Sequence, residues 1–388
     1  MSELRVYLDH AAATPLSARA AVAMTTAHEH FGNPSSLHHE GRAAGQSFAD
    51  SSARIAAVLG AAPGEILFTG SGSESDALAI MGVARAYRAR GKHIVVSAIE
   101  HKAVLKSAQL LVQEGFEISF VKPDSVGRID PAQVLALVRD DTTLVSIMYA
   151  NNEIGTVEPI ADIAALLRAR GAKRPLVHTD ACQAAGQLPL SVAALGVDLM
   201  SINAAKAYGP KGIGALYVRR GVTLMPLIPG EQQQGLRGGT ESVALAAGFA
   251  AALEEAEGMC TIEVPRLAAL RDLLWQEIKK EVPDVVLNGD PANRLANNLH
   301  VSVPGIEGES ILLMLDEAGI ACATGSACNS LDLEPSHVLL AVGGEAALAH
   351  GSIRFSLGRA NTKDNMHRTA REFGRIVRTL KSFSALTI

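Results

Sequence analysis

Short apolar runs alternate with longer helical patterns from about residue 40 to residue 220, and this alternation restricts the fold more than any other feature. Most runs are apolar at consecutive positions, as expected for strands covered on both faces. Strands and helices alternating over this length predict an open, mainly parallel sheet in a large α/β domain. The expected strands are Ile66–Thr69, Ile94–Ser97, Leu144–Met148, Leu176–Thr179, Leu199–Ile202 and Ala215–Val218, and the expected helices include Ser73–Arg90, Lys102–Gln113 and Ile160–Arg170.

The alternation ends near Thr240, and the rest of the chain predicts a smaller α+β domain. A length of 388 residues is also long for one hydrophobic core. We expect a large domain over residues 15–257 and a small domain over residues 1–14 and 258–388. The expected elements after Thr240 are two separate helices, Glu241–Glu257 and Val264–Glu281, strands Leu299–Val303 and Ser352–Ser356, and helices Glu307–Ala318 and Lys363–Lys381.

The composition is that of an ordinary globular protein and excludes several classes of function. The formal net charge is −5 without any block of Lys and Arg, so neither nucleic acid nor an anionic membrane surface is an expected partner. The first residues lack the pattern of a secretory signal, and no run approaches the roughly 20 apolar residues that span a bilayer. Four cysteines without a Cys-x-x-Cys pair predict a reduced, cytoplasmic protein.

Polar side chains follow three of the expected strands, where ligands bind in such sheets. The segment 70–73, Gly-Ser-Gly-Ser, is either an anion cradle or a turn with a helix cap. Asp180 is either a helix cap or a partner for a cationic ring nitrogen, and Lys206 taken alone is a surface lysine. Together they offer what pyridoxal 5'-phosphate needs: an anion site for the phosphate, an acid for the ring nitrogen and an amine for the aldehyde.

Longer motifs extend this interpretation over essentially the whole chain. They are YLDHAAATP, FGNPSS, FTGSGSESDALAI, EHKAV, NNEIG, HTDACQ, KAYGPKGIGALYVRR, RGGT, GSACNSLDLEPSHVL and SIRFSLGR. With these motifs the chain resembles the cysteine desulfurases of the NifS/IscS type, within the class V aminotransferase-like enzymes of fold type I. This resemblance implies a large α/β domain that binds pyridoxal phosphate and a smaller α+β domain that carries a catalytic cysteine.

The resemblance also implies roles for individual residues around the cofactor. Lys206 matches the lysine that binds the cofactor covalently and later moves the substrate Cα proton. His101 matches a histidine that stacks on the ring and shuttles protons, and Asp180 matches the partner of the ring nitrogen. The remaining matches are Gln183 at the ring oxygen, Gly72, Ser73 and Asn203 at the phosphate, Asn152 at the substrate and the cofactor, and Thr240 at the phosphate across a dimer interface, which implies a homodimer.

Two residues are matched to the substrate. Arg354 corresponds to the arginine that clamps the α-carboxylate, which a forked guanidinium fits better than lysine does. Cys328, in a loop of small and polar residues, corresponds to the nucleophile that attacks the substrate sulfur and carries the persulfide. Cys182, Cys260 and Cys322 are expected to be structural. No metal site is expected, because neither the cysteines nor the paired histidines have ligand spacing.

Two positions depart from the family pattern. Members usually have serine at the position of Asn203 and histidine at that of Ala205, and both normally face the cofactor phosphate. Asn203 retains an amide donor, whereas the alanine side chain has none. Losing one charge-assisted hydrogen bond, about 1.5–3 kcal/mol, predicts weaker cofactor retention. The chain also stops at Ile388 without the tail by which housekeeping members dock their scaffold protein, so no docking surface is predicted.

The predicted function is conversion of L-cysteine to L-alanine, with the sulfur passed from Cys328 to an iron–sulfur scaffold or a sulfur-carrier protein. Two related reactions stay open on the same fold, namely selenocysteine cleavage and transamination, and Cys328 argues against transamination. A non-catalytic sulfur-relay or binding protein is a further alternative, because Ala205 departs from the family.

Overall fold

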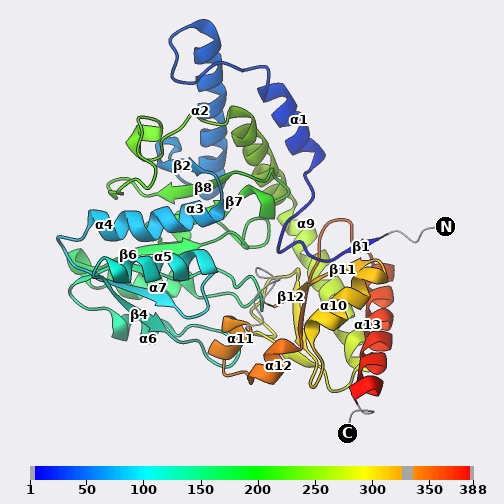
Figure 1. Cartoon of the computed structure of the whole chain (residues 1–388). Coiled ribbons are helices and arrows are strands. Elements are labelled where there is room, and N and C mark those ends of the chain that lie inside the picture. Colours follow the sequence, from blue (N-terminus) through cyan, green and yellow to red (C-terminus); the bar gives the residue numbers. More distant parts are fainter. Residues whose placement is uncertain (1–4, 326–334, 385–388) are drawn as a thin grey trace.

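The computed structural model describes residues 5–325 and 335–384, and a seven-stranded sheet is its largest element (Figure 1). The strand order is β2-β8-β7-β6-β5-β3-β4, and only the pairs that include β8 are antiparallel. The prediction of a mainly parallel sheet is therefore confirmed. The strands are β2 (Ile66–Thr69), β3 (His93–Ser97), β4 (Glu117–Val121), β5 (Thr142–Ser146), β6 (Leu176–Asp180), β7 (Leu199–Asn203) and β8 (Gly214–Val218).

Each face of this sheet has a hydrophobic core of its own, because successive strand residues point to opposite sides. On β3, Ile94 and Val96 belong to one core with Leu111 of α5, whereas Val95 belongs to the other core with Leu167 of α7. The helices of this part are α1 (Ala18–Ala27), α2 (His39–Leu59), α3 (Gly72–Ala77), the π-helix η2 (Leu78–Gly82), α4 (Val83–Ala86), α5 (Lys102–Gln113), α6 (Pro131–Leu137), α7 (Ile160–Arg168) and α8 (Val192–Leu195).

Strand β4 is absent from the sequence prediction for a physical reason. It lies at the edge of the sheet, and of its five residues only Val121 is buried. An edge strand covered on one side lacks the continuous apolar run by which the buried strands are recognised. The six predicted strands agree with the observed ones to within two residues at each end.

The rest of the chain forms smaller sheets with a separate core. Strand β1 (Val6–Tyr7) pairs in parallel with β11 (Ile320–Ala321), so the N-terminal segment joins the C-terminal part. A four-stranded antiparallel sheet lies beside it, in the order β12-β13-β10-β9. Its strands are β9 (Val286–Asn288), β10 (Asn298–Ser302), β12 (Ala323–Thr324) and β13 (Ser352–Ser356), and the helices of this part are α10 (Gly308–Glu317), α11 (His337–Ala341), α12 (Ala346–His350) and α13 (Lys363–Ser384).

The prediction of two separate helices after Thr240 is wrong. A single helix, α9 (Val243–Glu281), passes through Pro265 and runs from α1 and α2 to α13 (Figure 1). Its first half packs Phe249 and Leu253 into the core of the large sheet, and its second half packs residues such as Leu274 into the core of the small sheets. Burial at both ends outweighs the cost of a proline inside a helix. The domain boundaries themselves remain a prediction.

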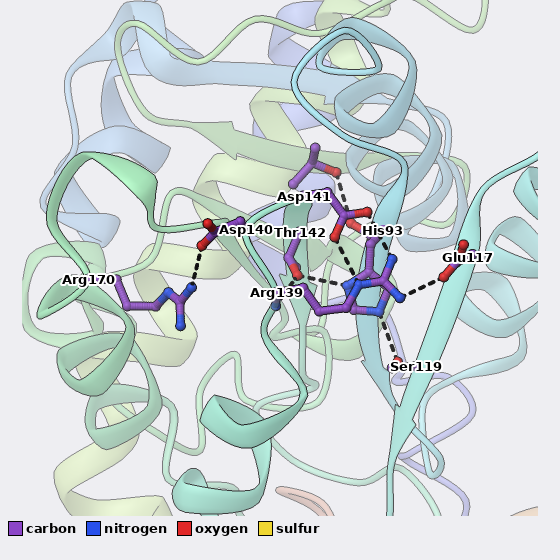
Figure 2. Close-up of polar contacts among 9 residues, drawn as sticks. His93, Glu117, Ser119, Arg139, Asp140, Asp141, Thr142 and Arg170 are labelled. Atoms are coloured by element: carbon purple, nitrogen blue, oxygen red, sulfur yellow. Dashed lines mark hydrogen bonds and ion pairs between the residues drawn. The ribbon is translucent and has the colours of Figure 1, made fainter.

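The N-terminal ends of β3, β4 and β5 are joined by polar contacts (Figure 2). Arg139 binds both carboxylate oxygens of Asp141 at 2.9 Å and Glu117 at 2.6 Å. The buried His93 ring contacts the Thr142 hydroxyl at 2.7 Å and the Ser119 hydroxyl at 2.9 Å. These contacts lie at the amino ends of the strands, away from the carboxyl ends where such sheets bind ligands. No helix within residues 5–325 and 335–384 combines the length and the apolar character needed to span a membrane.

Candidate active site

One cavity lies beyond the carboxyl ends of the strands and collects most of the predicted site residues. Those that line it are Gly72, Ser73, His101, Asn152, Asp180, Gln183, Asn203, Lys206 and Arg354. Two predicted residues are not placed there. Thr240 is exposed in the segment before α9, and Cys328 lies outside the described residues. The fold brings together predicted residues that are up to 282 positions apart in the sequence, from Gly72 to Arg354.

Lys206 ends a short 3-10 helix, η4 (Ala204–Lys206), directly after β7. Its Nζ donates to the backbone carbonyls of Ala11 at 2.8 Å and Ala12 at 2.5 Å, so the N-terminal segment crosses over the lysine. The turn is fixed by the Asn203 side chain, whose Oδ1 accepts from the Ala205 amide at 3.0 Å. Asn203 therefore both lines the cavity and orients the turn that carries the amine.

Asp180 is the last residue of β6. One carboxylate oxygen accepts from the Cys182 amide at 2.9 Å, but the segment that follows is a turn and not a helix, so the helix-cap interpretation is wrong. The same carboxyl group lines the cavity. Cys182 is buried as predicted, but it also forms part of the cavity wall. Burial, together with the charges of Asp180 and Asp76, raises the pKa of its thiol, which makes it a poor nucleophile.

The other two predicted structural cysteines are only partly buried. Cys260 on α9 donates its thiol hydrogen to the Ala256 carbonyl, with a sulfur–oxygen distance of 3.3 Å. Cys322 packs against the core of the small sheets, and burial raises the pKa of its thiol to about 12. Neither lines the cavity, so both fit a structural role.

A group of buried acids lies beside Asp180 and is absent from the sequence prediction. Asp76 on α3 lines the cavity, and burial together with the Asp180 charge raises its pKa well above the usual value. Burial raises the pKa of Glu100 to about 8 and lowers that of His178 to about 4. At neutral pH Glu100 is therefore mostly protonated and His178 is neutral. Asp76 follows Gly72 by four residues, and this helical spacing is the signal that could have identified it.

His101 begins helix α5 as its N-cap. Its Nδ1 accepts from the Ala103 amide at 3.1 Å, so in the neutral ring Nε2 carries the proton. His101 therefore caps α5 and also lies in the cavity wall. The ring can exchange a proton with a ligand through Nε2 while its other nitrogen fixes the orientation.

Arg354 on β13 is 4% exposed, and its guanidinium donates to the Asn152 carbonyl and to the Asp9 carboxylate, each at 2.9 Å. Its Nε has no hydrogen-bond partner among the described residues. A buried guanidinium with donors to spare in a polar cavity can bind a carboxylate. Glu153 and His337, which the sequence prediction missed, line the same wall.

The other end of the cavity is suited to an anion. Gly72 and Ser73 begin α3, behind the N-cap Ser71, and the helical course continues through η2 and α4. A Cβ at Gly72 would lie 2.6 Å from the Cys182 sulfur, so only glycine permits this close approach. Backbone N–H groups at the start of a helix bind phosphate. Within the described residues, no group of three His, Cys, Asp or Glu side chains is placed to hold a metal ion.

Comparison with known proteins agrees with this geometry. The family profile described as Aminotransferase class-V matches residues 6–368. The cysteine desulfurase IscS of Dictyoglomus turgidum is 47% identical over 381 residues, which are 98% of this chain and 96% of that protein. The IscS of Methanosarcina thermophila is 44% identical over 384 residues, 98% of this chain and 94% of that protein.

Solved structures show the same relationship. A NifS-like protein superposes with a TM-score of 0.91 at 35% identity, covering 97% of this chain and all of that one. SspA in complex with cysteine superposes with a TM-score of 0.79 at 35% identity, covering 91% of this chain and 98% of that one. The chain therefore belongs to the class-V aminotransferase family and, within it, to the cysteine desulfurases of the NifS/IscS type.

Proposed function

We propose that this desulfurase converts L-cysteine to L-alanine and retains the sulfur as a persulfide on Cys328, for transfer to iron–sulfur cluster assembly or thio-modification. The observation that carries the proposal is the convergence of the Lys206 amine, the Asp180 carboxylate and the Arg354 guanidinium on one cavity that begins at a helix N-terminus. An amine, an acid and a carboxylate clamp are the groups that a reaction at the α-carbon of an amino acid requires.

Pyridoxal 5'-phosphate is the cofactor that this set of groups fits. The Gly72 and Ser73 amides and the Asn203 side chain would hold the phosphate, Asp180 the ring nitrogen and Gln183 the ring oxygen. A side chain at position 72 would collide with Cys182, so the backbone there is bare, as close approach of a phosphate to its N–H groups requires. When bound, the cofactor supplies an electron sink for the carbanion formed at the substrate Cα.

The protein's own groups then have distinct tasks. Lys206 holds the cofactor and moves the Cα proton, Arg354 orients the α-carboxylate, and His101 exchanges a proton through Nε2. Asn152 contacts the substrate from the same wall. The Cys328 thiolate attacks the substrate sulfur: an S–S bond forms, the C–S bond breaks with its electron pair remaining on carbon, and a proton added there completes alanine.

A homodimer would complete the site. Thr240 is exposed and lies outside the cavity of its own chain, which is what a contact with the phosphate of a second subunit requires. The sulfur would pass to a scaffold or sulfur-carrier protein, since a persulfide needs an acceptor. SspA, whose structure contains cysteine, supports L-cysteine as the substrate.

Alanine and sulfide released from L-cysteine, with added pyridoxal phosphate and a thiol reductant, test the proposal. Wild-type protein should release both, and Cys328→Ala should release neither while its cofactor absorbance stays unchanged. Equal activity in both proteins would place the sulfur chemistry elsewhere. Parallel assays with L-selenocysteine and with a keto acid acceptor separate selenocysteine cleavage and transamination.

A further inference from the structure

Glu153 is a cavity residue to which neither the sequence nor the proposed reaction gives a task. It is 6% exposed, and both its backbone amide and its backbone carbonyl form hydrogen bonds with asparagine side chains. Its amide donates to the Asn151 side chain at 2.9 Å, and its carbonyl accepts from the Asn298 side chain of β10 at 3.0 Å. The side chain turns into the cavity, where Oε2 accepts the hydroxyl of Ser336 at the start of α11.

The carboxyl group lies beside the candidate carboxylate clamp. The Arg354 guanidinium donates to the carbonyl of Asn152, the residue directly before Glu153, and both side chains line the same cavity. Arg354 is already paired with Asp9 at 2.9 Å. A substrate carboxylate on Arg354 would therefore add a negative charge to the cavity that Glu153 lines, on a guanidinium that already neutralises Asp9. An added negative charge in a buried site favours protonation of a neighbouring carboxyl group.

Of the two carboxyl groups, Glu153 is the one that should take up the proton, and Asp9 should stay ionised. Asp9 is ion-paired with Arg354 and its side chain is 22% exposed, so its charge is both paired and partly hydrated. Glu153 is more deeply buried, and the contact described at Oε2 is a neutral hydroxyl. Burial raises the pKa of Glu153 to about 7, and the Ser336 hydrogen bond and Arg354 act against this rise. A further negative charge nearby would raise it again.

The other ionisable groups around Glu153 come from three elements. Lys102 and His101 at the start of α5 lower its pKa through their charges. His300 on β10 is neutral, because burial and the neighbouring arginines lower its pKa to about 3. His337 on α11 has its pKa lowered by burial. Among these acids and bases, Glu153 is an acid whose pKa burial brings near neutral pH, so a new anion nearby can change its protonation.

We propose that Glu153 takes up a proton when the carboxylate of an amino acid binds to Arg354, so that substrate binding and protonation of Glu153 are coupled. This rests on the proposed role of Arg354 in the reaction. Because protonated Glu153 favours the bound state, affinity for amino acids falls as the pH rises through the pKa of Glu153 in the ligand-free protein. The proton remains on the Glu153 carboxyl group, beside the substrate.

Calorimetric titration of the cofactor-loaded protein with L-alanine tests the proposal. Titrations in two buffers of different ionisation enthalpy give the number of protons taken up when L-alanine binds. Subtracting the number found for Glu153→Gln from that found for wild type removes the protons exchanged by the L-alanine amine and by the cofactor. This difference should be about 0.1 proton near pH 6 and about 0.9 proton near pH 8. Over the same range, the affinity of wild type should fall about tenfold relative to the variant.

Ser336→Ala gives a second readout that a merely structural role would not change. Losing the hydroxyl donor raises the pKa of Glu153, so the midpoint of proton uptake should move to higher pH, and Ser336→Thr should restore it. Alanine binding with equal proton uptake in wild type and Glu153→Gln would overturn the coupling and leave the proposed function intact. Loss of the uptake in Asp9→Asn instead would assign the proton to Asp9. Failure of L-alanine to bind wild-type protein would refute the carboxylate site itself.

Discussion

Replacing Glu100 by glutamine should make the protein more stable at high pH. Glu100 is fully buried; its Oε1 accepts from the Ser97 hydroxyl at 2.5 Å and from the Met148 amide at 2.7 Å, whereas Oε2 has no partner among the described residues. Burial raises its pKa from 4.5 to about 8. Glutamine retains the accepting oxygen and cannot ionise, so it imitates the protonated acid.

The sign and the size of the effect follow from proton linkage. Between these two pKa values the unfolded chain releases the Glu100 proton and the folded chain keeps it, so the free energy of unfolding of wild type falls as the pH rises. A shift of this size corresponds to about 5 kcal/mol in full, of which about 3 kcal/mol should be lost between about pH 5 and about pH 7.5. The loss stops once the pH exceeds the folded pKa.

Urea unfolding followed by circular dichroism at both pH values measures the difference between wild type and Glu100→Gln. The advantage of the variant should grow by about 3 kcal/mol over this range. The exposed Glu309→Gln serves as the control for removing a carboxylate at the surface. A constant difference for Glu100→Gln would show that Glu100 is ionised in the folded protein and would refute the reasoning.

Three further predictions concern the cofactor, the substrate and the large sheet. Ala205→His restores a donor toward the phosphate and should slow cofactor loss during dialysis by about tenfold or more; unchanged loss would mean that position 205 does not reach the phosphate. Arg354→Lys loses the forked donor and should raise KM for L-cysteine by about tenfold with the cofactor absorbance unchanged, whereas a change in kcat alone would contradict a binding role. Asp198 is 1% exposed and accepts hydrogen bonds from Arg174 and Arg219, each at 2.6 Å. Asp198→Asn should therefore lower the free energy of unfolding, measured in urea titrations, by about 3 kcal/mol. A change near zero would show that these ion pairs contribute little to stability.

The buried strands and the residues that follow them could be predicted because each signal is local. A strand covered on both faces is a run of apolar residues, and Asp180 and Lys206 come directly after such runs. Strand β4 and the continuous helix α9 could not be predicted in this way. Their formation depends on tertiary neighbours: an edge pairing with β3 in one case, and two separate cores that bury the halves of one helix in the other.

In the candidate site, too, residues with a local sequence signal could be predicted and residues defined by distant neighbours could not. Gly72, Asp180 and Lys206 could be placed at strand ends, and the family resemblance added residues such as His101. Asp76 and Glu153 were missed, because what distinguishes a buried acid from a surface one is its environment, to which distant segments contribute. The hydrogen bond between Glu153 and Ser336 joins residues 183 positions apart, and no local pattern predicts it.

The most direct test of the central claim is to locate the sulfur after a single turnover. Cofactor-loaded protein is mixed with one equivalent of L-cysteine without reductant, blocked with an alkylating reagent, digested and analysed by mass spectrometry. We predict that the peptide containing Cys328 gains the mass of one sulfur atom, that the peptides of Cys182, Cys260 and Cys322 do not, and that one alanine appears per sulfur bound. Alanine formed with the added sulfur on another cysteine, or on none, would contradict the assignment of Cys328 as the sulfur acceptor.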